Sequence, residues 1–106
     1  MIEDISPTEL CNRCNSGELW QLLDVRESWE TKIAAIKSAI FIPMTEIPER
    51  LAELDRNQPV AVICHGGIRS ARVAAFLKAQ GFKSVINIRG GIDAWSLEVD
   101  GSIPRY

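Results

Sequence analysis

The most constraining feature of this sequence is a short apolar run that leads into a glycine-rich loop and then into a helical pattern. Residues 60–63 are all apolar, which is typical of a parallel strand covered on both faces. The loop after it consists of Cys64, His65, Gly66, Gly67, Ile68 and Arg69. A helical spacing of apolar residues begins near Ser70. The sequence therefore predicts a buried strand that ends at Cys64, followed by a tight turn and a helix.

This junction favours the thiolate form of Cys64. Glycines allow successive backbone N–H groups to turn toward one atom, and the start of a helix adds the positive end of its dipole. The guanidinium of Arg69 acts in the same direction. Because the thiolate is the nucleophilic form of cysteine, we interpret the loop as a reactive site. The alternative is that Cys64 is a small core residue.

Four apolar runs alternate with helical patterns along the chain. The predicted strands cover residues 20–25, 39–42, 60–63 and 85–88. Helices are predicted after the capping residue Ser6, within residues 28–36, over 45–54, over 70–80 and after Gly91. This alternation over 106 residues predicts one α/β domain, residues 1–106, with a parallel sheet and helices on both faces. Ligands bind beyond the carboxyl ends of strands in such sheets, where both Asp24 and Cys64 are expected.

The composition argues against several classes of protein. A net charge of −2 and the lack of a basic run give no support for binding nucleic acid or an anionic membrane. No apolar run approaches the roughly 20 residues of a membrane-spanning helix, and the first residues lack a signal-peptide pattern. Three cysteines, an odd number, argue against a disulfide framework. We therefore expect a reducing compartment, with the cytoplasm as the default.

Cys11 and Cys14 form a Cys-x-x-Cys pair in the first predicted helix. Zinc normally takes four ligands, and the remaining cysteine and histidine both lie in the Cys64 loop, so no metal site is predicted. A redox pair would ordinarily open a helix that follows a strand. The spacing places Cys14 on the face of Leu10 and rotates Cys11 away from it. We interpret the pair as structural, with Cys14 in the core, and leave a redox role open.

Four ordered blocks of sequence carry a resemblance to a known family. They are residues 23–27, 39–43, 64–70 and 87–95. With these blocks the chain resembles a single-domain rhodanese-like sulfurtransferase over nearly its whole length. The resemblance implies a mainly parallel five-stranded sheet with helices on both faces. One departure is that the chain has Ala34-Ala35-Ile36 where the family often has Gly-His-Ile.

The resemblance implies a chemistry of sulfane-sulfur transfer. Cys64 would take sulfur from thiosulfate or another persulfide donor, hold it as a persulfide, and pass it to a thiol or protein acceptor. The N–H groups of residues 65–70 would cradle the persulfide, and no metal or organic cofactor is required. Asp24 and Arg26 would support the loop through hydrogen bonds and an ion pair. A monomer is expected.

Two other functions stay open at this point. A phosphatase or arsenate reductase of this fold has five residues between the cysteine and the arginine, whereas four separate Cys64 from Arg69. The shorter loop suits one sulfur atom better than a phosphate. A non-catalytic rhodanese module that binds proteins commonly lacks the cysteine or the arginine, and this chain keeps both.

The roles of two loop residues also have alternatives. Arg69 either steers an anionic donor and lowers the pKa of Cys64, or pairs with a carboxylate under the loop. His65 either acts as a general base or makes a peripheral contact, and sulfur transfer from a thiolate needs no base. The sequence does not identify the physiological sulfur donor or acceptor.

Overall fold

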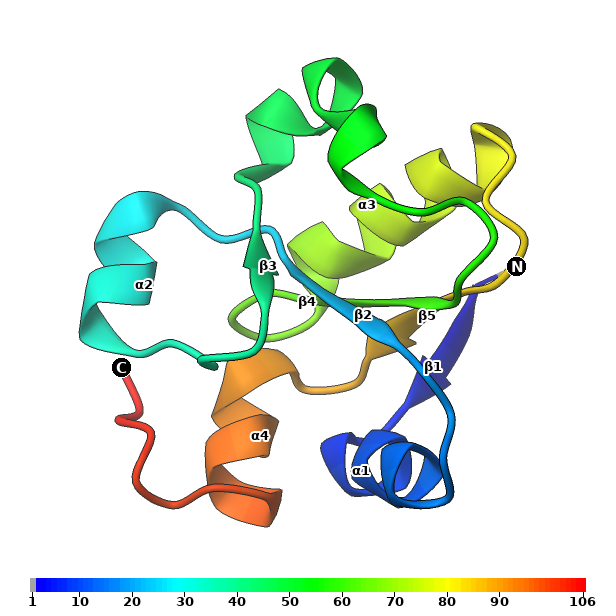
Figure 1. The fold of residues 1–106 in the computed structure, drawn as a ribbon. Coiled ribbons are helices and arrows are strands. Elements are labelled where there is room, and N and C mark those ends of the chain that lie inside the picture. Colours follow the sequence, from blue (N-terminus) through cyan, green and yellow to red (C-terminus); the bar gives the residue numbers. More distant parts are fainter. Residues whose placement is uncertain (1) are drawn as a thin grey trace.

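A five-stranded parallel sheet with helices on both faces forms the core of the computed structural model, which describes residues 2–106 (Figure 1). The strands are β1 (Glu3–Ile5), β2 (Gln21–Asp24), β3 (Ile40–Phe41), β4 (Val60–Ile63) and β5 (Val85–Ile88). Their order in the sheet is β1-β5-β4-β2-β3, with every neighbouring pair parallel. The strand that leads to Cys64 is therefore the central one, and the predicted α/β class is confirmed.

Helices connect the strands and cover the two faces of the sheet. The α-helices are α1 (Pro7–Asn15), α2 (Ser28–Ile33), α3 (Ile68–Ala79) and α4 (Gly91–Glu98). Figure 1 shows α1 and α4 together on one side of the sheet, with α3 on the other. Within residues 2–106, none of the helices combines the length and the hydrophobicity that crossing a bilayer requires.

The segment expected to form one α-helix over residues 45–54 forms two 3-10 helices instead. These are η1 (Met44–Glu49) and η2 (Leu51–Glu53). Pro48 lies inside η1, and its ring would clash with the carbonyl group four residues earlier in an α-helix. The tighter i→i−3 bonds avoid this clash, for example from the Arg50 N–H to the Ile47 carbonyl oxygen at 3.1 Å.

The side chains of β4 alternate between two hydrophobic cores. Val60, Val62 and the adjoining Cys64 pack with α3 and η1, whereas Ala61 and Ile63 pack with α1 and α4. All four strand residues are fully buried. The prediction from the uninterrupted apolar run, that this strand is covered on both faces, is confirmed.

β1 is the strand that the apolar pattern does not reveal. It has three residues, of which Glu3 and Asp4 are exposed and Ile5 is buried. As an edge strand it pairs with β5 alone, which places Asp4 beside Asn87. Three residues with one buried side chain give too little alternation for recognition from the sequence.

The two ends of α3 fix the geometry of the loop before it. The helix begins at Ile68, two residues earlier than the predicted Ser70. Gly67 precedes it with a φ of 113°, a conformation that favours glycine. At the other end, the helix ends at Ala79, one residue before the predicted end at residue 80, and Gly81 follows with a φ of 92°. The early start brings the positive end of the helix dipole into the Cys64 loop.

Candidate active site

Hydrogen-bond donors from the loop and from the first turn of α3 surround the sulfur of Cys64. The Gly67 N–H donates to Sγ at 3.0 Å, and the Ser70 Oγ lies 3.3 Å from Sγ. Burial raises the pKa of the thiol, but hydrogen bonds from the Ser70 hydroxyl and from the N–H groups of Ser70, Gly67 and Gly66 outweigh it. The net result is a thiol pKa below its ordinary value. The site therefore favours a thiolate.

The sulfur lies behind the outer part of the loop. Cys64 is 1% exposed, whereas Ile68 at the tip of the loop is 75% exposed and Gly66 is also exposed. The sulfur is thus close to the surface of the loop's outer residues but is itself almost fully covered.

The start of α4 holds the carbonyl groups of the loop away from the sulfur. The Ile92 N–H donates to the Cys64 carbonyl oxygen at 2.8 Å, and the Asp93 N–H donates to the His65 carbonyl oxygen at 3.3 Å. Gly91 has a φ of 60°, and a Cβ at this position would overlap both carbonyl oxygens. The sequence predicts only that a helix begins after this glycine. In the structure it allows two helix N-termini to meet at one loop.

Asn87 in β5 fastens the loop from beneath. Its Nδ2 donates to Asp4 Oδ1 at 3.1 Å and to the Gly67 carbonyl oxygen at 3.2 Å, and its Oδ1 accepts from the Ser70 hydroxyl. Ser70 has one hydroxyl proton, so Asn87 and the Cys64 sulfur compete for it. The available signal for this residue was a polar side chain within an otherwise apolar strand.

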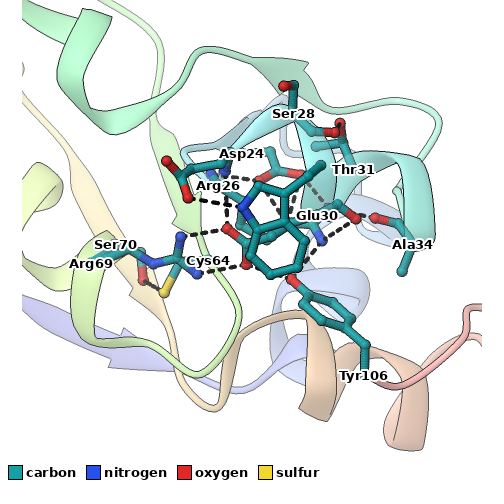
Figure 2. A network of polar contacts seen from close by, with 12 residues as sticks. Asp24, Arg26, Ser28, Glu30, Thr31, Ala34, Cys64, Arg69, Ser70 and Tyr106 are labelled. Atoms are coloured by element: carbon teal, nitrogen blue, oxygen red, sulfur yellow. Dashed lines mark hydrogen bonds and ion pairs between the residues drawn. The ribbon is translucent and has the colours of Figure 1, made fainter.

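Arg69 pairs with the carboxylate of Glu30 (Figure 2). Its two terminal nitrogens donate to the two carboxylate oxygens at 2.6 and 2.8 Å. The Arg69 side chain is 31% exposed and that of Glu30 is 2% exposed. The guanidinium holds the pKa of Glu30 at about 2, well below its ordinary range. Of the two roles considered for Arg69, this geometry corresponds to pairing with a carboxylate. That Arg69 also steers an anionic donor stays a prediction.

Asp24 and Arg26 form a buried ion pair at the same edge of the sheet. The Arg26 Nη2 lies 2.7 Å from Asp24 Oδ2, and the side chains are 0% and 3% exposed. Among the described residues, neither side chain has a hydrogen bond to the loop 64–70. The connection is indirect, because Arg26 donates to the Tyr106 hydroxyl at 2.9 Å and this hydroxyl donates to Glu30, the partner of Arg69.

Tyr106 and Glu30 are the site residues that sequence reasoning missed. The Tyr106 hydroxyl lies 2.7 Å from Glu30 Oε2, and its ring stacks on His65 with the centroids 4.1 Å apart and the planes at 9°. His65 therefore makes the peripheral contact considered as the alternative to a general base. Neither residue had a local signal, because Tyr106 lies in an irregular tail and Glu30 lies among polar residues of a short helix.

The expectation for the two cysteines of α1 is wrong in one respect. Cys14 is exposed and Cys11 is partly buried against the core beside α4, which reverses the predicted arrangement. The last turn of α1 borders an open recess of about 250 Å³, lined in part by both cysteines and Trp20, so Cys14 does not meet a closed core. Within residues 2–106 there is no cluster of three or more side chains suited to a metal ion.

The family of this chain follows from comparison with known proteins. The family model for the rhodanese-like domain matches residues 6–98. The chain belongs to the rhodanese-like family. This rhodanese-like chain is 39% identical to the putative sulfurtransferase YtwF of Bacillus subtilis, over 92% of the chain and 93% of that protein. The resemblance inferred from the four sequence blocks is confirmed.

Two further relatives agree with this assignment. The chain is 44% identical to the chloroplastic rhodanese-like/PpiC domain-containing protein 12 of Arabidopsis thaliana, over 99% of the chain but only 38% of the plant protein. The crystal structure of a rhodanese-like domain protein from Staphylococcus aureus superposes with a TM-score of 0.84 at 33% identity, over 99% of both chains. The rhodanese-like fold is thus confirmed, and sulfurtransferase relatives support sulfur transfer in general.

Proposed function

We propose that this rhodanese-like domain transfers a sulfane sulfur through a persulfide on Cys64. The observation that carries the proposal is the set of donors around Sγ: the Gly67 N–H at 3.0 Å and the Ser70 hydroxyl at 3.3 Å, at the start of α3. These donors favour the thiolate before the reaction. They also stabilise the negative charge of a persulfide after it.

The proposed reaction has two displacement steps at sulfur. The Cys64 thiolate attacks the outer sulfur of thiosulfate, the S–S bond of thiosulfate breaks, and sulfite leaves with the bonding electron pair. An acceptor, which is cyanide in a test tube or a thiolate in a cell, then attacks the outer sulfur of the persulfide and releases the Cys64 thiolate. Each step exchanges one sulfur-bound group for another. The chemistry of the cycle therefore requires neither a metal nor an organic cofactor.

The position of Arg69 supports sulfur chemistry over phosphate chemistry. A phosphatase site of this kind needs a guanidinium that faces the phosphate oxygens. Both terminal nitrogens of Arg69 are instead directed at Glu30, whose carboxylate is 2% exposed. Four loop residues between Cys64 and Arg69 also leave a smaller ring of donors.

The proposal includes partners and a compartment. The donor is a small sulfur compound such as thiosulfate or a persulfide, and the acceptor is a thiol or a protein. Nucleic acid and membrane are not among the proposed partners, since the net charge is −2 and the sequence has no basic run. The domain acts as a monomer in a reducing compartment, by default the cytoplasm, because Cys64 must remain a free thiolate between cycles.

Intact-mass analysis after incubation with thiosulfate tests the proposal. The wild type is expected to gain one sulfur, and cyanide is expected to remove it. A variant with both Cys11→Ser and Cys14→Ser is the matched control and should gain the same sulfur, whereas Cys64→Ser should gain none. A sulfur retained by Cys64→Ser would contradict the proposal. Cys64-dependent release of phosphate from an aryl phosphate, with no added sulfur, would favour a phosphatase instead.

A further inference from the structure

We propose that Tyr106 positions the Cys64 loop, with its ring holding the first part of the loop and its hydroxyl joining the two ion pairs beside it. The inference rests on the proposed function, because it concerns the same thiolate. Tyr106 lies 42 residues beyond Cys64 and outside the residues matched by the family model, 6–98. Figure 2 shows its hydroxyl directed at Glu30, on the side of the network opposite Ser70 and Cys64.

The hydroxyl of Tyr106 connects a buried ion pair with a partly exposed one. It accepts a hydrogen bond from Arg26 Nη1 at 2.9 Å and donates one to Glu30 Oε2 at 2.7 Å. Arg26 is paired with Asp24, and Glu30 is paired with Arg69 in the first turn of α3. Burial raises the pKa of the phenol to about 12, so the hydroxyl keeps its proton and remains a donor. The two pairs are thus fixed relative to each other.

The ring of Tyr106 acts on the loop itself. It lies parallel to the His65 imidazole with the centroids 4.1 Å apart, and it meets the Trp29 ring edge-on at 6.2 Å. The carbonyl oxygen of His65 is held by the Asp93 N–H. His65 is therefore fixed on both sides, immediately before Gly66, whose N–H helps to lower the pKa of the Cys64 thiol. Fixing His65 limits the freedom that the two glycines give to the loop.

The tail that carries Tyr106 is anchored to α4. The Ser96 hydroxyl in α4 donates to the Ile103 carbonyl oxygen at 2.6 Å, and Ile103 is buried. Arg105 pairs with Asp93 at 2.7 Å, also in α4. The start of α4 in turn bonds the carbonyl groups of the Cys64 loop. α4 therefore sets the position of both the loop and the aromatic ring that covers it.

The ring and the hydroxyl have separable effects. Without the ring, His65 is released and the N–H groups of Gly66 and Gly67 spend less time directed at the sulfur, so the pKa of the Cys64 thiol rises. Without the hydroxyl alone, the ring still covers His65 and the thiol pKa stays the same. The domain then loses stability instead, because Arg26 is fully buried and its Nη1 loses a hydrogen-bond acceptor.

The pH dependence of Cys64 alkylation tests this role. Iodoacetamide reacts with the thiolate, so the midpoint of the rate against pH reports the thiol pKa, and peptide mapping separates Cys64 from the other two cysteines. Tyr106→Leu is expected to raise the midpoint by on the order of one pH unit. Tyr106→Phe, which keeps the ring, is expected to have the wild-type midpoint. Phe82→Leu removes a buried aromatic ring beyond the far end of α3 and is the control for lost stability. Its alkylation midpoint is expected to equal that of the wild type.

The outcomes separate positioning from mere stability and from the proposed function. If Tyr106→Leu keeps the wild-type midpoint and loses stability as Phe82→Leu does, Tyr106 has no positioning role. If Tyr106→Phe shifts the midpoint as far as Tyr106→Leu, the role assigned to the ring is wrong. A wild type that takes no sulfur from thiosulfate would contradict the proposed function, and the alkylation midpoints would still decide the role of Tyr106.

Discussion

Replacing Glu30 by glutamine is expected to destabilise the domain at neutral pH. The Glu30 carboxylate accepts two hydrogen bonds from Arg69 at 2.6 and 2.8 Å, one from the Tyr106 hydroxyl at 2.7 Å, and one from the Glu27 N–H at 3.0 Å. Each oxygen therefore receives two donors. Glutamine keeps the shape of the side chain but directs an NH₂ group at two of these donors, and it removes the charge that Arg69 requires.

The magnitude follows from the pKa of Glu30. The pKa falls from an ordinary 4.5 to about 2, chiefly through the hydrogen bonds from Arg69. At about 1.4 kcal/mol per pKa unit, this shift corresponds to about 3 kcal/mol of stability. The Arg69 side chain is 31% exposed, so water screens part of the attraction. We therefore expect Glu30→Gln to cost about 2–3 kcal/mol at neutral pH.

The sign of the pH dependence is also fixed. A carboxylate whose pKa is lowered by folding contributes stability above the pKa of the unfolded chain, and this contribution is lost as the pH falls toward the pKa of the folded state. For Glu30, this stability is lost as the pH falls from 4.5 to about 2. The difference in unfolding free energy between the wild type and Glu30→Gln should shrink across this range, measured by urea unfolding with tryptophan fluorescence.

Glu53→Gln is the matched control for this experiment. Glu53 also makes a bidentate contact with an arginine, at 2.6 and 2.9 Å from Arg50, but the Glu53 side chain is 47% exposed, against 2% for Glu30. An exposed pair of this kind contributes little, and no measurable change in stability is expected. Equal stabilities of Glu30→Gln and Glu53→Gln at neutral pH would refute the account. A loss in Glu30→Gln that did not change with pH would refute it as well.

Two further changes test the surroundings of the sulfur. Ser70→Ala removes the largest of the contributions that lower the pKa of the Cys64 thiol, so the midpoint of alkylation by iodoacetamide should rise. An unchanged midpoint would mean that Ser70 donates its proton to Asn87 Oδ1 and not to the sulfur. Gly91→Ala places a Cβ against the loop carbonyls at a φ of 60°, so it should reduce both stability and sulfur loading from thiosulfate. Gly101→Ala, which meets open space, should change neither; equal behaviour of the two variants would contradict the role of Gly91.

The central strand and the loop could be predicted from the sequence because their signals are local. Val60 to Gly67 occupy consecutive positions, and burial on both faces of a parallel strand leaves a continuous apolar run. The C-terminal end of α3 at Gly81 was likewise marked by one residue. These features depend on backbone preferences and burial, which a single stretch of sequence records.

The supporting contacts could not be predicted because their partners lie far apart in the chain. Tyr106 meets Glu30 across 76 positions, and Asn87 meets Asp4 across 83. No periodicity within one segment specifies such a pairing. The misplaced Cys14 has a related cause, since helical spacing defines a face but does not show whether the neighbouring elements close over its last turn.

Titration of the Cys64 thiolate tests the central claim most directly. The ultraviolet absorbance of thiolate is measured against pH for the wild type and for Cys64→Ser, so that their difference isolates Cys64 from Cys11 and Cys14. The account predicts a difference curve with its midpoint below the ordinary thiol value of 9.0, because the amides of the loop and the Ser70 hydroxyl face the sulfur. A midpoint at or above that value would show that burial dominates, and Cys64 would then be an inert core thiol.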